Sequence, residues 1–295
     1  MLRSPRRLLS RVVAPFLVAS VALAGCAGSG EETIRSTSET RPDRAENGTE
    51  ATTPDPAAAV REAAKAPSEQ GSMTMEMVME VDGRTIMSMR GTMTADGRNG
   101  DLTTSMEGMP GGEMRMLVVD GVHYYAFPSL PAGKEWVSMS PEELVDATGV
   151  DPSAAPGVDG ASVLEMLSAV ADDVEELGTD ELFGVPVTGY RAHVSAESVI
   201  GQALGSGLYT EELADEMAGT LPDTYAIDVW LDDDGLPRRQ TWSLDLALPG
   251  QGNTTVDYRM DFPSWGDPVE VTAPSPDVVI SMEDVMTGGG ALSRD

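Results

Sequence analysis

The sequence predicts an α+β fold whose main element is an antiparallel β-sheet. Two observations indicate this fold. Many short segments alternate apolar and polar residues with the period of two that is typical of half-buried strands, and Asp-Gly pairs, which favour tight hairpin turns, separate several of them. Segments with helical character lie before, between and after two runs of such strands. That order is typical of α+β proteins.

The stretch from Ser72 to Val119 shows the alternation most clearly, and methionine occupies most of its apolar positions. A strand places every second residue on one face, and Asp82-Gly83 and Asp96-Gly97 are suited to turn the chain between strands. The methionines expected to share a face are Met73, Met75, Met77 and Met79 in the first strand, Met87, Met89 and Met93 within residues 84–95, and Met114 and Met116 within residues 113–119.

Three interpretations of this methionine face follow from its chemistry. Most apolar strand faces form an ordinary hydrophobic core. Methionine is unbranched and polarizable, so the face also suits the wall of a cavity that accepts a flexible apolar ligand, whereas a well-defined core favours branched residues. Thioethers are soft ligands for Cu(I), although no His or Cys lies within the stretch. The pattern alone leaves the three interpretations open.

The remaining elements follow from capping residues, turn residues and periodicity. Pro56 begins an Ala-rich helix, Ser140 and Glu143 form a capping pattern around Pro141, and residues 161–171 are amphipathic, which indicates a helix packed on the sheet. The helices are expected at residues 56–66, 140–147, 161–171, 196–204, 210–218 and 281–286. The strands after the methionine stretch are expected at residues 122–127, 135–139, 174–177, 185–195, 224–231, 237–248, 253–262, 265–271 and 277–280.

The amino terminus predicts export and lipid attachment. Four arginines precede the short apolar run Val12 to Ala22, which is typical of a signal peptide and short for a membrane span. The run ends in Leu23-Ala24-Gly25-Cys26, a bacterial lipobox, in which cleavage before the cysteine accompanies its acylation. The alternative is a secretory signal with a cysteine there by chance. Arg6-Arg7 leaves open whether the Sec or the twin-arginine route exports the chain.

The domain organisation follows from composition. We expect a signal peptide at residues 1–25, a polar disordered tether at residues 26–55, one folded domain at residues 56–288 and a flexible tail at residues 289–295. A tether of this length spans about 30 Å as a flexible coil, which lets the domain stand off the membrane. Since Cys26 is the only cysteine, an internal disulfide is excluded.

The charge of the chain excludes one class of partner. The formal net charge is −30, and removal of the four arginines of the signal peptide leaves about −34. A surface of this sign repels phosphate groups, so nucleic-acid binding is not expected. It also gives no electrostatic attraction to anionic lipids, so the acyl anchor at Cys26 has to hold the protein at the membrane.

No catalytic or metal-binding pattern stands out. His123 and His193 are far apart in sequence, and each lies in an expected strand. The chain has no Gly-x-Ser-x-Gly elbow, no phosphate-binding loop and no His-Glu-x-x-His motif. The acidic run Asp232 to Gly235 lacks the distal ligands of a calcium loop and indicates a hairpin turn instead. We therefore expect no cofactor, no metal and no enzymatic activity.

Several segments together carry a resemblance to a known family. They are the lipobox with its tether, Asp120 to Tyr125 followed by Lys134 to Val137, Val229 to Pro237, and Phe262 to Pro274. In this combination the chain resembles the LppX/LprG-type bacterial lipoproteins of the LolA/LolB-like superfamily. The resemblance implies a curved antiparallel half-barrel that wraps over a few helices and encloses an apolar cavity. It also implies binding of a lipid or acylated glycolipid and no catalytic residues.

The combined expectation is a monomeric lipoprotein at the outer face of the cytoplasmic membrane that carries a lipid within the cell envelope. The alternative is a structural or signalling lipoprotein with a filled core that acts through its outer surface, with Cu(I) binding as a third class. The residues expected to line the cavity are Met75, Met77, Met79, Met87, Met89, Met93, Met114, Met116, Leu164 and Leu167.

Overall fold

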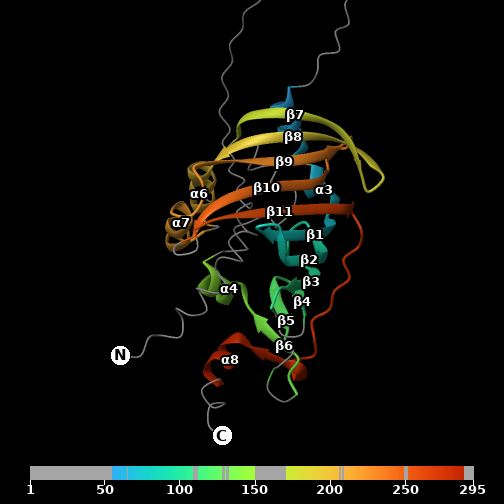
Figure 1. The fold of residues 1–295 in the computed structure, drawn as a ribbon. Helices are drawn as coiled ribbons and strands as arrows, with labels where there is room; N and C mark the ends of the chain where they lie inside the picture. The colour runs from blue at the N-terminus through green and yellow to red at the C-terminus, as the bar shows by residue number, and fades with distance from the viewer. Residues whose placement is uncertain are drawn as a thin grey trace, which may run out of the picture.

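A computed structural model describes residues 55–64, 66–108, 112–127, 130, 133–149, 171–205, 207, 209–248 and 252–288. Within these residues one sheet of twelve strands dominates (Figure 1). Its strands are β1 (Ser72–Val81), β2 (Arg84–Thr94), β3 (Gly100–Met106), β4 (Glu113–Val119), β5 (Val122–Ala126), β6 (Trp136–Met139), β7 (Ala171–Leu182), β8 (Val185–Ser195), β9 (Thr224–Asp232), β10 (Pro237–Leu248), β11 (Gly252–Trp265) and β12 (Val279–Ser281).

The described helices are short. They are α2 (Pro56–Ala63), α3 (Ala66–Gln70), α4 (Pro141–Thr148), α6 (Ala196–Gly205), α7 (Glu211–Ala218) and α8 (Met282–Gly288), with a 3₁₀ turn at Pro276–Val278. In Figure 1, α4, α6 and α7 lie at one end of the strands. Since a long antiparallel sheet is accompanied by a few separate helices, the predicted α+β class is confirmed.

The strand order is β12-β6-β5-β4-β3-β2-β1-β11-β10-β9-β8-β7. Neighbours are antiparallel except β12, which runs parallel to β6. The central pair joins the two runs of strands, because β1 begins the first run and β11 ends the second. The sheet curves but does not close on itself, with β7 and β12 at its edges, so the expected open half-barrel is confirmed (Figure 1).

Local sequence signals account for the predicted turns and caps. The β1–β2 and β4–β5 hairpins turn at Asp82-Gly83 and Asp120-Gly121, where all four residues have positive φ. In α4 the Ser140 hydroxyl accepts from the amide of Glu143, whose carboxylate accepts in turn from the amide of Ser140, so the expected capping box is present.

Two expectations about element bounds were wrong. The helix expected over residues 56–66 is two helices, α2 and α3, and the chain continues through Pro67 in the second because proline is tolerated in the first turn of a helix. The strand expected at residues 265–271 is absent. Instead β11 extends to Trp265, and residues 266–275 form neither helix nor strand. Gly266 has a φ of +79°, and Pro268 and Pro274 lack the amide hydrogen that a central strand needs.

The structure adds one strand and lengthens another. Strand β3 is an addition, with Leu102 as its buried aliphatic residue. Strand β7 runs from Ala171 to Leu182, well beyond the four residues expected, and forms one edge of the sheet. The helix expected over residues 161–171 lies mostly outside the described residues, as do Leu164 and Leu167.

Candidate functional site

The methionines of β1 and β2 share one face of the sheet and meet in cross-strand pairs. In the antiparallel register Met73 is opposite Met93, Met77 opposite Met89, and Met79 opposite Met87. Met75 is opposite Gly91. Because residues directly opposite each other place their side chains side by side, the thioethers form a continuous patch. We call this side of the sheet the inner face, because the core residues lie on it.

Gly91 allows the sheet to stay continuous at the middle of this patch. A Cβ atom at position 91 would lie 2.0 Å from the carbonyl oxygen of Asp101 on β3. Only glycine fits so close an approach between two backbones. The neighbouring side chains Met75 and Leu102, each 1% exposed, cover the position from either side.

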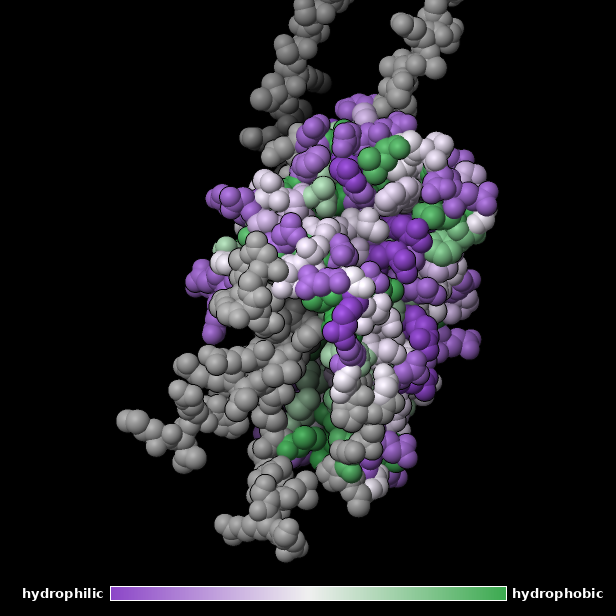
Figure 2. All heavy atoms as spheres, viewed as in Figure 1, coloured by the Kyte–Doolittle hydropathy of each residue, from purple (hydrophilic) through white to green (hydrophobic). Residues whose placement is uncertain are grey.

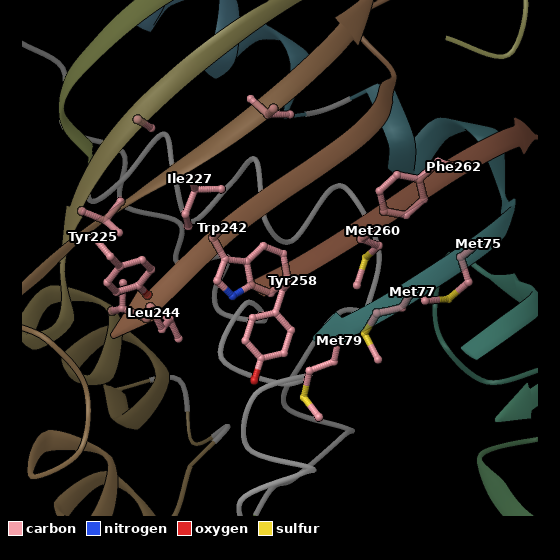
Figure 3. Close-up of a cluster of buried hydrophobic side chains, with 14 of the residues drawn as sticks. Met75, Met77, Met79, Tyr225, Ile227, Trp242, Leu244, Tyr258, Met260 and Phe262 are labelled. Carbon is pink, nitrogen blue, oxygen red and sulfur yellow. The ribbon is translucent and has the colours of Figure 1, made fainter. Parts of the chain in front are cut away.

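The second run of strands continues the inner face with aliphatic and aromatic side chains. Trp242 is opposite Tyr258 in the register of β10 and β11, and their rings stack with centroids 4.9 Å apart. Figure 3 shows these two rings on the same side of the sheet as Met75, Met77 and Met79, with the phenol oxygen of Tyr258 directed away from the strands. The other buried residues of this part are Ala192, Val194, Tyr225, Ile227, Val229, Leu244, Val256, Met260 and Phe262.

Burial of the inner face is uneven: Val118, Val137 and Met139 on β4 and β6 are as buried as the centre of the sheet, but four methionines between β1 and β5 are not. The β1 methionines Met75, Met77 and Met79 are 1–2% exposed, and on β2 Met87 is 7% and Met93 6% exposed. By contrast, Met89, Met106, Met114 and Met116 are only half-buried. Because all four lie on the inner face by register, the apolar wall is incompletely covered on the β2–β4 side.

Aromatic side chains extend the wall across β5. His123 and Tyr125 point to the inner face, since Tyr125 is opposite Met116 and His123 opposite Val118 in the register with β4. Their rings stack at 6.2 Å, and Phe127, which is 40% exposed, follows at 6.3 Å from Tyr125. Figure 2 shows hydrophobic atoms in a hollow near this end of the molecule, where β5, β6 and α8 lie in Figure 1.

Burial also sets the ionisation of these β5 side chains. Removal from water disfavours the charged form, so it lowers the pKa of His123 and raises the pKa of Tyr125 to about 12. Within the described residues His123 Nδ1 has no hydrogen-bond partner. Both side chains are therefore neutral near pH 7, and the wall carries no charge at this end.

One polar residue interrupts the apolar wall near its centre. Gln240 on β10 is 0% exposed, and within the part of the chain that the structure describes both its amide oxygen and its amide nitrogen lack a hydrogen-bond partner. The register places it between Val229 of β9 and Met260 of β11. Sequence reasoning missed this residue. Its alternation with Trp242 and Leu244 along β10 was a signal that could have placed it on the inner face.

The described helices pack mainly on the second run of strands. Val60 and Ala63 of α2 join the core that the sheet forms, and so do Ala196 and Val199 of α6. A smaller cluster holds α6 and α7 together through Ile200, Ala203, Tyr209, Leu213, Ala214 and Met217. The amide of Thr210, the N-cap of α7, donates to the carbonyl of Gly149 after α4 at 3.0 Å and so joins the two helices.

The outer face of the sheet is charged, and ion pairs lie along it. Arg191 forms two hydrogen bonds with Asp228 at 2.6 Å, and Asp261, 7% exposed at its side chain, accepts from Arg239 at 2.5 Å. A shallow groove of about 350 Å³ lies between such pairs. It is lined by Val78, Glu80, Arg191, Ala226, Asp228, Thr241, Trp242, Ser243, Asp257, Tyr258 and Arg259. The two faces of the sheet therefore differ sharply in chemistry.

The acidic run at residues 232–235 and His193, the remaining candidates from the sequence, do not form a binding site among the described residues. Asp232 accepts from the amides of Asp234 and Leu236 and from Arg238, so the acidic run is a hydrogen-bonded turn as predicted. His193 is exposed on β8. Within the described residues no cluster of three or more His, Cys, Asp or Glu side chains could hold a metal ion. None of the described helices is both long and apolar enough to span a membrane.

These observations define an α+β protein whose open, curved antiparallel sheet has an apolar inner face rich in methionine and a charged outer face. The chain belongs to the family of unknown function DUF7537, whose sequence model matches residues 11–262. No curated protein matches it.

The chain is also similar to several solved structures. One is the Mycobacterium tuberculosis lipoprotein LppX, with 15% identity over 73% of this chain and 99% of that chain and a TM-score of 0.44. Another is LprF from Mycobacterium bovis, with 18% identity over 75% and 99% and a TM-score of 0.44. A LolA superfamily protein from Nitrosomonas europaea matches with 11% identity over 68% and 92% and a TM-score of 0.23.

Proposed function

We propose that this chain is a membrane-anchored lipoprotein that binds a lipid or glycolipid and carries it within the cell envelope. Acylated Cys26 anchors it at the outer face of the cytoplasmic membrane, and the folded domain works as a monomer without catalysis. The ligand's acyl chains lie against the inner face of the sheet. The residues that we assign to the ligand cavity are Met75, Met77, Met79, Met87, Met89, Met93, Met114 and Met116, together with Leu164 and Leu167.

The observation that carries the proposal is the incomplete burial of the inner face between β2 and β5. Met89, Met106, Met114 and Met116 keep part of their apolar surface uncovered there, and Phe127 is 40% exposed beside them. Apolar surface that stays partly uncovered often marks a ligand-binding groove or an interaction site. A ligand chain that covers it gains about 25 cal/mol per Å² of buried apolar area before ordering costs.

The proposal is tested by asking what the protein carries. The full-length chain is purified from its own host, and native mass spectrometry and organic extraction identify bound molecules. We expect lipid in a fixed ratio to protein, bound in addition to the acyl groups on Cys26. A chain that is folded and free of lipid under these conditions would contradict the proposal and favour the structural or signalling alternative.

Variants of the half-buried methionines locate the binding surface. Met89→Gln and Met116→Gln keep the length of the side chain but place an amide where an acyl chain is expected. Each is expected to weaken lipid binding about tenfold, which corresponds to about 1.4 kcal/mol, as measured by lipid retained per chain and by competition with a fluorescent lipid. Ser88→Gln, which lies on the outer face of β2, is the control and leaves binding unchanged. Equal losses in all three variants would count against the inner face as the site.

A further inference from the structure

The side-chain amide of Gln240 is the most unusual polar group of the inner face. The side chain is 0% exposed, and neither its oxygen nor its nitrogen has a hydrogen-bond partner among the described residues. Its register neighbours, Val229 at 0% and Met260 at 2% exposed, offer only apolar side chains. Folding normally pairs such groups, so a buried amide with both ends free requires an explanation.

The neighbours of Gln240 on the inner face do not supply the missing partners. Trp242, two residues along β10, forms no hydrogen bond through its indole nitrogen within the described residues, and neither does the hydroxyl of Tyr258 opposite it. Figure 3 shows both rings directed to the same side of the sheet as the methionines. The polar ends of these two side chains therefore lie on the same face of the sheet as Gln240.

We infer that Gln240 recognises a hydroxyl group carried on the acyl chain of the bound lipid. This inference rests on the proposed function. A primary amide needs a partner that both accepts from its nitrogen and donates to its oxygen. A hydroxyl does both with one small atom. An ester carbonyl only accepts and leaves the amide oxygen unpaired, and a plain hydrocarbon chain satisfies neither end.

The strand order places this hydroxyl far from the lipid headgroup. Gln240 on β10 lies three strands from β2 and five from β4, and the inner face is partly uncovered at methionines of both strands. At about 4.8 Å between strands, the path along the sheet is about 14 to 24 Å. A lipid whose headgroup stays at the uncovered end therefore reaches Gln240 only with the middle or distal part of a long chain. The inferred ligand class is a lipid with a hydroxyl in the body of its acyl chain.

The test uses neutral ligands that differ by one hydroxyl. The protein is the delipidated mature chain carrying Cys26→Ser, which needs no detergent because it has no acyl anchor. Each ligand competes with Nile red for this protein, and the three ligands are methyl 12-hydroxystearate, methyl 3-hydroxystearate and methyl stearate. We expect the 12-hydroxy ester to bind about tenfold more tightly than the other two. Gln240→Met should bind all three alike and melt about 2–4 °C higher without ligand, because it removes an unpaired buried amide. Thr241→Val, on the opposite face of β10, keeps the preference.

A measurement on the unaltered side chain keeps the inference testable if Gln240→Met does not fold. The chain has four glutamines, Gln70, Gln202, Gln240 and Gln251, so ¹⁵N-glutamine labelling gives few side-chain amide signals. The hydroxylated ester should shift one pair of signals that methyl stearate leaves in place.

The outcomes separate this inference from the proposed function. Binding of all three esters without preference, or a preference that persists in Gln240→Met, overturns the role of Gln240 and leaves lipid binding standing. Failure of every ester to displace Nile red, together with no lipid in the protein from its host, overturns both.

Discussion

Gly91 is the residue on which the continuity of the methionine patch depends. Gly91→Ala would force a Cβ atom to within 2.0 Å of the Asp101 carbonyl, so β2 and β3 would have to separate. We expect a loss of about 3 kcal/mol of unfolding free energy, measured by urea denaturation. Gly201→Ala is the control, because it lies within α6 and an added Cβ there would meet no atom within 4 Å. It should stabilise the protein by about 0.5–1 kcal/mol, and similar values for both variants would contradict the steric explanation.

His123 gives the protein a specific dependence on pH. Burial lowers the pKa of this imidazole below its usual 6.5, so the unfolded chain binds a proton at a pH where the folded chain does not. The neutral side chain stabilises the fold fully above about pH 7. This contribution is lost as the pH falls below 6.5 toward the lowered pKa of the folded state.

The prediction is that His123→Asn flattens the fall in stability between about pH 7.5 and about pH 5. Melting temperatures across this range measure the effect, and the difference between variant and wild type removes the contribution of the many carboxylates. His193→Asn, at an exposed site on β8, is the matched control. A wild-type slope that is the same in His123→Asn would show that the fold does not lower the pKa of this imidazole.

Among the elements, the β9–β10 turn depends on a single side chain. Asp232 is 8% exposed and its carboxylate accepts from two turn amides and from Arg238 at 2.8–3.0 Å. Asp232→Ala leaves these donors without their partner and should cost about 2–3 kcal/mol, measured by chemical denaturation. Asp233→Ala, exposed in the same turn, should change stability by less than about 0.5 kcal/mol. A comparable loss in both variants would contradict the assigned role.

The elements that could be predicted from the sequence are those with strong alternation or clear turn chemistry. The sequence predicts the strands with methionine at every second position and the Asp-Gly turns. Both signals are local, because the period of the side chains and a positive φ depend only on neighbouring residues. Strand β3 was not predicted, since Leu102 is its only aliphatic residue and its threonines and serine fit a loop as well. Its position depends on pairing with β2 and β4, which no local pattern records.

The candidate site was predictable only in part for the same reason. Alternation placed the methionines on one face, but it did not indicate which strands from the end of the chain complete the wall. Met260 is opposite Met77 because β11 returns to pair with β1, a contact between residues almost at opposite ends of the domain. Gln240 was missed because a glutamine in a strand is usually exposed. Its burial follows from its register neighbours, Val229 on β9 and Met260 on β11.

At the scale of the whole molecule, the proposed anchor at Cys26 and the charge of the chain have to act together. With about −34 charges after the proposed signal cleavage, the protein has no electrostatic attraction to anionic lipids. Cys26→Ser should therefore move it from the membrane to the soluble fraction, as measured by fractionation and by loss of the acyl mass. The wild type should stay in the membrane fraction in about 1 M salt as in about 0.1 M salt, because acyl chains and not ion pairs hold it. Release of the wild type by salt would contradict this anchor.

The open sheet leaves β7 as an unpaired edge, and its composition has a consequence for crowded surfaces. Six of the twelve residues of this strand are acidic, and irregularities in its pairing with β8 interrupt it at two places. When two copies approach edge to edge, the acidic side chains of the two β7 strands repel each other, and the irregular backbone of β7 fits a second strand poorly. Strand addition and fibre growth are therefore disfavoured. If the proposed anchor holds many copies side by side on one bilayer, these copies should therefore remain dispersed, even though each has an unpaired strand edge.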